Sequence, residues 1–289
     1  MSLNRKRIME NIFQSKQITF VIGEEQKKYY VHESSFSRLS RPLKALLTGG
    51  MKESQNAKVV WAEVDDDVFL ALVDFAYHDS YTIPSLRKVK EGKHFPVSNT
   101  WEGFGSDNSQ DDAKNEPRKR TFPSIISWML ETGTECTPKY DLCKDKFNGG
   151  QGVYRNPAST LIWATEMRMT DRTGYTDVFM LHARLYVLAD TYAIEQLRKL
   201  CLQRIRISFL NVTPNAELLE TLHDLIIYAF ENTKASDELR TPLLHFCIAQ
   251  MEWIRSSGFL ERMREELPEF LADLALEIPF EFWSSIGGS

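Results

Sequence analysis

Two blocks of regular hydrophobic patterning are separated by a polar segment that covers residues 85–177. Gly, Asn, Ser, Asp and Lys are frequent in this segment, and structureless connections longer than about 12–15 residues are uncommon in compact domains. We therefore expect an insertion that is rich in loops but partly folded. Residues 124–133 and 156–167 carry helical signals, the second with Asn156 and Pro157 at its start, and we expect both helices to pack on the main body.

The block before the insertion begins with strands. Residues 18–22 and 29–32 are rich in β-branched and aromatic side chains and flank a polar turn, which predicts a β-hairpin. A short helix capped by Ser34 should follow, and Pro42 begins a second helix that ends at Gly49. The hairpin therefore leads directly into a pair of short helices.

The same block continues with a third strand and a longer helix. Residues 58–61 form the predicted strand. Three successive aspartates, residues 65–67, favour a helix start because negative charge is stabilised at the N-terminal end of the helix dipole. This helix should end near His78, and residues 81–83 are predicted to form a short closing strand.

The block after the insertion is helical. Apolar side chains recur every three to four residues over residues 181–205, which predicts a pair of helices. Further helices are predicted from Pro214, over residues 237–255, and over residues 259–277 with a break at Pro268. The C-terminal third of the chain is therefore expected to contain helices and no strands.

The composition excludes several classes of function. The formal net charge is −5, whereas binding to nucleic acid or anionic lipid depends on clustered Lys and Arg. The basic runs at residues 5–7 and 118–120 are short, and we interpret them as solvated patches. Residues 1–15 lack the unbroken apolar stretch of a signal peptide, and no segment reaches the roughly 20 apolar residues of a membrane span. We therefore expect a protein of the cytoplasm or nucleus, without nucleic-acid or membrane partners.

No arrangement of histidines, cysteines and carboxylates indicates catalysis or metal binding. Cys136 and Cys143 lack the two-residue spacing of common zinc sites, and His245 and Cys247 would point to different faces of one helix. Sequence motifs of serine hydrolases, zinc proteases and phosphate-binding loops are missing. We predict no enzymatic activity, no cofactor and no metal site. The four cysteines are too few for a disulfide framework, so we expect buried free thiols.

The order of the elements resembles that of the BTB/POZ domain of intracellular adaptor proteins, especially the fungal type. The resemblance is carried by four stretches: ITFVIG at residues 18–23, VHESSFSRLSRPLKALLTGGMKES at 31–54, VDDDVFLALVDFAYHDSYTI at 64–83 and LHARLYVLADTYAIEQLRKLC at 181–201. It implies an α+β fold in which a small mixed sheet is flanked by helical hairpins. Here that fold would carry a long insertion and an all-helical C-terminal extension, and Gln17 stands where the family often has an acidic residue.

This resemblance divides the chain into five segments. The expected segments are an N-terminal segment at residues 1–15, the first part of the BTB/POZ domain at 16–84, the insertion at 85–177, the closing helices of the domain at 178–210, and the helical extension at 211–289.

The resemblance also implies that the chain works by binding other proteins. In BTB adaptors that recruit a cullin-type ubiquitin ligase scaffold, a hydrophobic residue and an acid lie in the loop after the helix pair. Met51 and Glu53 match that pattern: Met51 would enter an apolar slot on the cullin and Glu53 would accept hydrogen bonds, with Tyr77 and His78 beside them. His32 is interpreted as a histidine hydrogen-bonded at the head of a helix rather than a catalytic or metal-binding one.

An alternative of a different class remains open. The domain could serve only for self-association or scaffolding in a transcriptional or signalling complex, as a dimer without a ligase. An N-terminal helix would then bury Ile8, Ile12 and Phe13 in the dimer interface.

Two further sequence features carry predictions. Thr121 follows a basic run in the manner of a kinase site, so it is a candidate phosphorylation site. The C-terminal region is rich in aromatic residues, and we expect at least one of four to pack against the body: Trp253, Phe280, Phe282 and Trp283.

Overall fold

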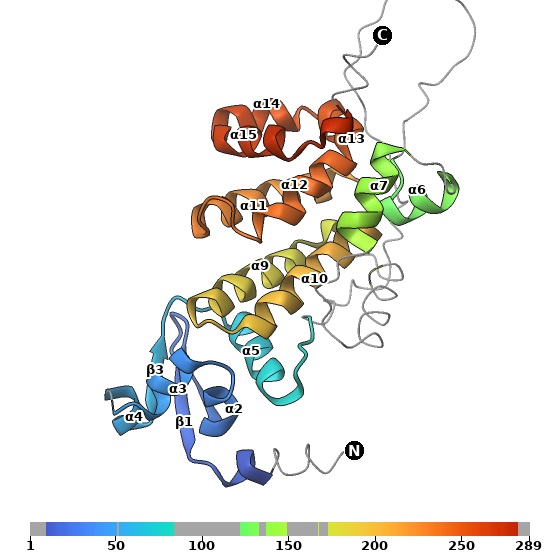
Figure 1. Ribbon diagram of the computed structural model, residues 1–289. Coiled ribbons are helices and arrows are strands. Elements are labelled where there is room, and N and C mark those ends of the chain that lie inside the picture. Colours follow the sequence, from blue (N-terminus) through green and yellow to red (C-terminus); the bar gives the residue numbers. More distant parts are fainter. Residues whose placement is uncertain are drawn as a thin grey trace, which may run out of the picture. The chain divides into compact units, whose positions relative to one another are not determined.

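The computed structural model describes residues 10–50, 52–83, 122–132, 137–148, 167 and 173–282 (Figure 1). The chain forms two compact units, which we describe separately. Unit 1 takes its described residues from Met1–Ser85 and Met180–Cys201, and unit 2 takes them from Leu86–Phe179 and Leu202–Ser289.

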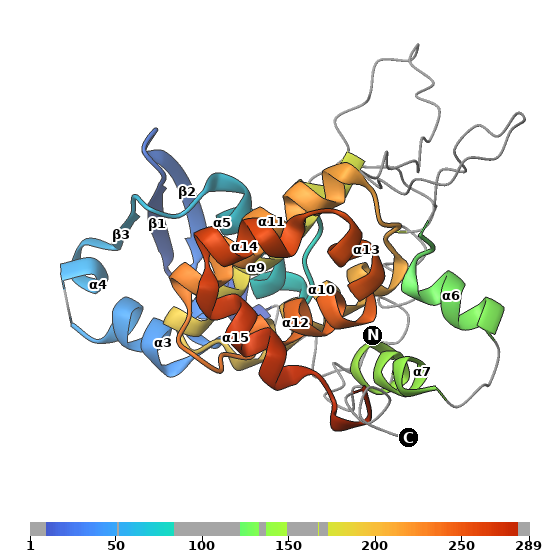
Figure 2. The same ribbon diagram turned by 90° about the horizontal axis from the view of Figure 1, so that it is seen from above.

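Unit 1 contains a small mixed sheet of three strands, β1 (Gln17–Ile22), β2 (Lys27–His32) and β3 (Lys58–Trp61). β1 lies between the other two (Figure 2), antiparallel to β2 and parallel to β3. The predicted hairpin and third strand are therefore confirmed, as is the α+β fold class.

The predicted closing strand at residues 81–83 is wrong, because these residues join no sheet. The carboxylate of Asp74 accepts hydrogen bonds from the backbone N–H and the hydroxyl of Thr82, at 2.8 and 3.0 Å. The backbone donor that a sheet would use is thus bonded to a helix side chain instead.

The helices of unit 1 follow the sequence pattern closely. Those of the first block are α2 (Glu33–Ser37), α3 (Arg41–Thr48), α4 (Lys52–Asn56) and α5 (Asp66–His78). Unit 1 also includes the part from Met180 to Cys201 of the helices α9 (Thr176–Thr191) and α10 (Glu195–Asn211).

The cap predicted for the first short helix is wrong. α2 begins at Glu33, so His32 rather than Ser34 occupies the N-cap position, and its side chain forms no cap hydrogen bond. The N–H of Ser34 instead donates to the hydroxyl of Ser15, at 3.2 Å, so a residue from the preceding helical turn satisfies this helix start.

The inner face of the sheet builds the core of unit 1. Side chains alternate across a strand, so Phe20 faces inward and its ring lies 5.0–5.2 Å from the rings of Phe36, Trp61 and Phe69. All four side chains are buried. The opposite face carries Tyr30 and other partly or fully exposed side chains.

Two contacts join the segments of unit 1 that lie on either side of the insertion. The hydroxyl of Tyr81 lies 2.8 Å from Nδ1 of the buried His182, and the guanidinium of Arg184 forms an ion pair with Asp65 at 2.6 Å. The part of the helical pair from Met180 to Cys201 therefore belongs to the same unit as the sheet.

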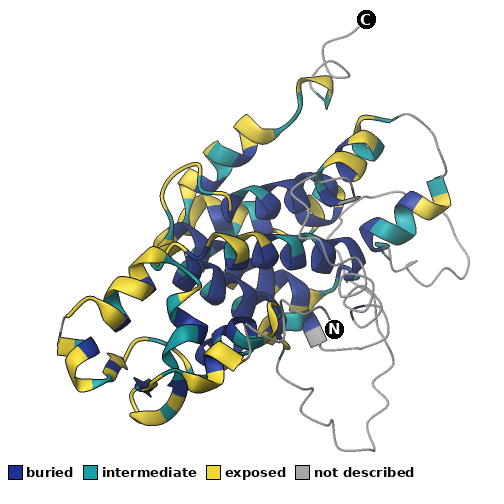
Figure 3. Ribbon diagram, turned by 60° about the horizontal axis from the view of Figure 1, so that its bottom comes forward, coloured by how far each residue is buried: buried dark blue, intermediate teal, exposed yellow. Residues whose placement is uncertain are grey.

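Unit 2 consists of helices. From the insertion come α6 (Ile125–Thr132), α7 (Pro138–Cys143) and the π-helical turn η1 (Lys144–Asn148). A single 3-10 turn, η2 (Thr173–Tyr175), precedes α9. The C-terminal helices are α11 (Ala216–Asn232), α12 (Arg240–Ala249), α13 (Met251–Ser256), α14 (Phe259–Glu266) and α15 (Pro268–Glu277). α12 is buried along almost its whole length, whereas α14 and α15 also carry exposed residues; Figure 3 colours the chain by burial.

In unit 2, one predicted helix is wrong and one predicted helix break is confirmed. The helix predicted over residues 237–255 is two helices, because the backbone at Gln250 leaves the helical conformation and its side chain donates to the carbonyl of Pro123. The predicted break at Pro268 is confirmed. α11 begins at Ala216, two residues later than predicted, since Asn215 caps it by accepting from the N–H of Leu218.

A column of stacked aromatic rings forms the centre of unit 2. The ring of Phe209 lies 4.6 Å from that of Phe179 and 4.2 Å from that of Phe246. Trp253 packs at an angle on Phe246 and is 2% exposed. Trp253 therefore meets the expectation that an aromatic residue of the C-terminal region packs against the body, whereas Phe280 is 79% exposed and Trp283 lies outside the described residues.

Candidate protein-binding surface

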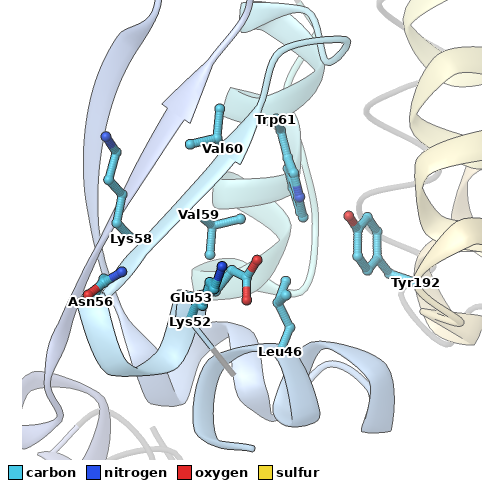
Figure 4. Close-up of a pocket in the computed structure, with 9 residues that line it drawn as sticks. All are labelled: Leu46, Lys52, Glu53, Asn56, Lys58, Val59, Val60, Trp61 and Tyr192. Carbon is cyan, nitrogen blue, oxygen red and sulfur yellow. The ribbon is translucent and has the colours of Figure 1, made fainter. Parts of the chain in front are cut away.

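A groove with a volume of about 450 Å³ lies along β3 in unit 1 (Figure 4). Its walls come from α3, α4, β3 and the turn after α9. The lining residues are Leu46, Lys52, Glu53, Asn56, Lys58, Val59, Val60, Trp61 and Tyr192.

The floor of the groove is apolar and joins distant parts of the sequence. The rings of Trp61 and Tyr192 lie 4.7 Å apart, and Figure 4 shows both rings and Leu46 pointing toward one another. Burial raises the pKa of the Tyr192 hydroxyl, so this group stays protonated at neutral pH. The floor can therefore receive an apolar side chain beside a hydroxyl that acts as a hydrogen-bonding group.

Local sequence positions the wall that α3 contributes. The side chain of Ser40 caps α3, and Pro42 in its first turn fixes the backbone for a helix start. Leu43 and Leu47 are fully buried and anchor the helix. Leu46, on the flank of this apolar stripe, is left half-buried at the groove.

α4 holds the charged rim. Ser54 is buried, and its carbonyl accepts a hydrogen bond from Lys16 at 3.1 Å. Lys52 and Glu53, at the start of the helix, reach the groove. The sequence predicts a loop here, and the short helix corrects that expectation while keeping Glu53 at the surface.

The structure brings together only part of the predicted site. Glu53 lines the groove, whereas Met51 lies outside the described residues. The Tyr77 hydroxyl lies 2.9 Å from Nδ1 of His32, at the end of β2, and His78 is bonded to Asp74 on its own helix. β2 and β3 are the opposite edges of the sheet, so Tyr77 and His78 are not part of the groove.

The interpretation of His32 agrees with its surroundings. His32 precedes α2, its N–H donates to the Tyr77 hydroxyl at 3.0 Å, and its ring packs edge-on against Phe13. These contacts attach the end of β2 to α5 and give the histidine a structural role.

Sequence reasoning missed three residues that line the groove: Leu46, Trp61 and Tyr192. Each lies in an apolar pattern that predicts core, and Trp61 is indeed almost fully buried. Tyr192 lies directly after an apolar helix and is half-buried, and its sequence position alone does not indicate a groove. Its contact with the ring of Trp61 is seen only in the folded structure.

Buried thiols in the described residues are poor nucleophiles. Cys143, Cys201 and Cys247 are free and buried, which confirms the expectation for these three. Burial raises the pKa of Cys143 to about 11 and raises that of Cys247 as well. Within the described part of the chain, no cluster of three or more His, Cys, Asp or Glu side chains could hold a metal ion. The helices described there also include none that is long and apolar enough to cross a bilayer.

Comparison with known sequences identifies a domain family for the part of the chain that contains the three-stranded sheet. Residues 9–93 match the family model of the BTB/POZ domain. A search of curated proteins found no match.

Proposed function

We propose, from the premise that this chain contains a BTB/POZ domain, that it is a substrate adaptor which recruits a cullin-type ubiquitin ligase scaffold. The domain makes the chain a protein–protein interaction module. The adaptor role, the likeness to fungal-type adaptors and a cytoplasmic or nuclear location belong to the proposal. We assign the chain no enzymatic reaction.

The observation that carries the proposal is an acidic residue at the rim of an apolar groove. Glu53 lies beside the floor formed by Leu46, Trp61 and Tyr192. A helix binds such a groove by inserting apolar anchors while its polar groups meet charges at the rim. By resemblance, Met51 and Glu53 would supply the apolar and acidic contacts to the cullin, and Tyr77 and His78 remain a prediction outside this groove.

The experiment is a binding measurement with a purified cullin N-terminal domain. Glu53→Lys combined with Met51→Ala should weaken binding by at least about tenfold, because residues at the centre of an interface dominate its affinity. Glu24→Lys is the matched control: it makes the same charge change at an exposed position in the β1–β2 turn and should bind normally. Equal binding by the double variant and the wild type would exclude this surface, and no binding by the wild type would exclude the adaptor role.

The alternative function, self-association without a ligase, is supported by an exposed aromatic residue. Phe13 is 63% exposed, whereas Ile12 beside it is buried within its own chain. Exposed aromatic side chains are frequent anchors of protein interfaces. Sedimentation velocity tests it: a dimer that dissociates in Phe13→Ser supports the scaffold, and a monomer at every concentration removes it.

Thr121 and the basic residues before it lie outside the described residues. Phosphorylation at Thr121 therefore stays a prediction, which mass spectrometry of the native protein can test.

A further inference from the structure

β3 is an edge strand that lies in the groove along its full length. Among the described strands it pairs only with β1, and all four of its residues, Lys58–Trp61, line the groove. An edge strand presents backbone donors and acceptors that no neighbouring strand satisfies.

The hydrogen bonds to β1 identify which groups are presented. The carbonyl of Ala57 accepts from the N–H of Thr19 at 2.8 Å, and the carbonyl of Trp61 accepts from Gly23 at 3.0 Å. Residues two apart on a strand share one orientation, so the backbone of Val59 faces β1 too. The N–H and C=O groups of Lys58 and Val60 therefore point to the open edge.

The edge lacks two of the features that protect such strands, a proline and a bulge, although β3 is short and carries one lysine. Natural edge strands are commonly blunted by proline, a bulge or a covering segment. β3 contains no proline and stays in regular register with β1 from Lys58 to Trp61. Val60 is 57% exposed. Lys58 is the one charge on the strand, and a lysine can either repel another strand or attract an acidic one.

The charges beside the edge favour an acidic partner, because two lysines and one acid line the groove: Lys52, Lys58 and Glu53. Lys52 and Lys58 are both exposed, and neither forms an ion pair within the described residues. An acidic residue placed across from Lys58 would make a favourable cross-strand pair, while its neighbours in the strand would point to the other face, toward the groove floor of Leu46, Trp61 and Tyr192.

We propose that the open edge of β3 binds an extended segment of another protein, in which acidic and apolar residues alternate, as an added strand. This inference goes beyond the adaptor proposal, since it concerns a backbone edge and a different class of ligand. A second copy of this chain fits less well: β3 itself carries no acidic residue, so a paired β3 strand would place no carboxylate directly across from Lys58.

The test uses the full chain labelled with ¹⁵N and a capped pentapeptide in which Val and Glu alternate. Adding the peptide should give saturable shifts of the Lys58 and Val60 amide signals. Two control peptides, one with Lys in place of Glu and one with N-methylated backbone amides, should bind at least about tenfold more weakly, because they lose the charge pair or the strand hydrogen bonds.

Two variants separate backbone pairing from side-chain contact. Val60→Pro removes an N–H that does not bond to β1, so the sheet should persist while peptide binding is lost. Val60→Thr keeps the N–H and the β-branched shape and should bind the peptide normally. If Val60→Pro fails to fold, Lys58→Glu replaces it, and this variant should prefer the Val/Lys peptide.

Each outcome decides the proposal. No saturable shift up to about 5 mM peptide, equal binding of the Lys-containing peptide, or full binding by a folded Val60→Pro variant would overturn it. Concentration-dependent shifts of the same amides without peptide would identify a second copy as the occupant and would also overturn it. Peptide binding and cullin binding are measured separately on the wild-type chain, so peptide shifts without cullin binding would remove only the adaptor proposal, and cullin binding without peptide shifts would remove only this inference.

Discussion

The two units use their polar side chains in different ways. In unit 2, buried charged and polar groups are bonded to backbone carbonyls and to neighbouring helices. Along the groove of unit 1, Lys52, Glu53 and Lys58 are at the surface and form no ion pair within the described residues. Polar groups that hold helices together stabilise a fold, whereas charged groups left in water beside an apolar floor are available to a partner. We therefore expect the bonded polar groups of unit 2 to contribute to stability and the groove of unit 1 to contribute to binding.

The largest expected effect is the loss of Arg240. Its side chain is 7% exposed, donates to the carbonyls of Phe230 and Thr233 at 3.0 and 2.6 Å, and lies over the ring of Phe230. Arg240→Ala leaves buried carbonyls unsatisfied and should reduce the free energy of unfolding by about 2–4 kcal/mol.

Urea unfolding measures this change, and hydrogen exchange should show the loss of protection in α11 and α12. Arg264→Ala, at an exposed position, is the control and should change stability by less than about 0.5 kcal/mol. Similar effects of the two variants would mean that the buried contacts of Arg240 do not stabilise unit 2.

A smaller effect is expected for the buried pair that joins the two segments of unit 1. Tyr81→Phe removes the hydroxyl that lies 2.8 Å from His182 and should cost about 1–2 kcal/mol of unfolding free energy. Tyr30→Phe removes a hydroxyl from a side chain that is 67% exposed and should be nearly neutral. Thermal unfolding of both variants provides the comparison, and a neutral Tyr81→Phe would contradict the importance assigned to this bond.

Unit 2 should also respond to pH through His245. Burial lowers its pKa, while Glu277 raises it and the cations Lys146 and Arg206 lower it further. A histidine with a lowered pKa in the folded state binds fewer protons than in the unfolded chain, so its contribution to stability is present above the unfolded pKa and is lost as pH falls.

His245→Gln removes this titration. Between pH 7 and 5, the stability of the variant should therefore fall less steeply than that of the wild type. Chemical denaturation at several pH values measures the two slopes, and parallel curves would contradict the assignment.

The smallest effect on stability is expected at the groove. Glu53→Lys changes a surface side chain with no ion pair in the described residues and should shift the free energy of unfolding by less than about 0.5 kcal/mol. The same substitution, combined with Met51→Ala, is the one proposed to weaken cullin binding. A large loss of stability would mean that Glu53 supports the fold, which would remove the contrast drawn above.

The local elements were largely predictable because each depends on neighbours in the sequence. The apolar runs around Phe20 and Val59 are strands, and the aspartates before Val68 begin a helix. The errors arose at residues that bond outside their own local pattern: the N–H of Thr82 donates to the carboxylate of Asp74, and the side chain of Gln250 donates to the carbonyl of Pro123.

The candidate site was predictable only in part. A family pattern predicts that Glu53 binds a partner, and in the structure Glu53 lines a groove with an apolar floor. Tyr77 is close to Glu53 in the order of elements, but its hydroxyl contacts His32 at the end of β2, the edge strand opposite β3. Strand order is a tertiary property, so counting along the chain could not separate them.

Hydrophobic periodicity, helix caps and strand composition fixed the kind and order of the elements, because these signals act within a few residues. The pairing of Trp61 with Tyr192, and the grouping of the described part of the insertion with the C-terminal helices, came from the folded structure alone. Both depend on contacts between residues far apart in the chain, and a local pattern shows which face of a helix is buried but not what buries it.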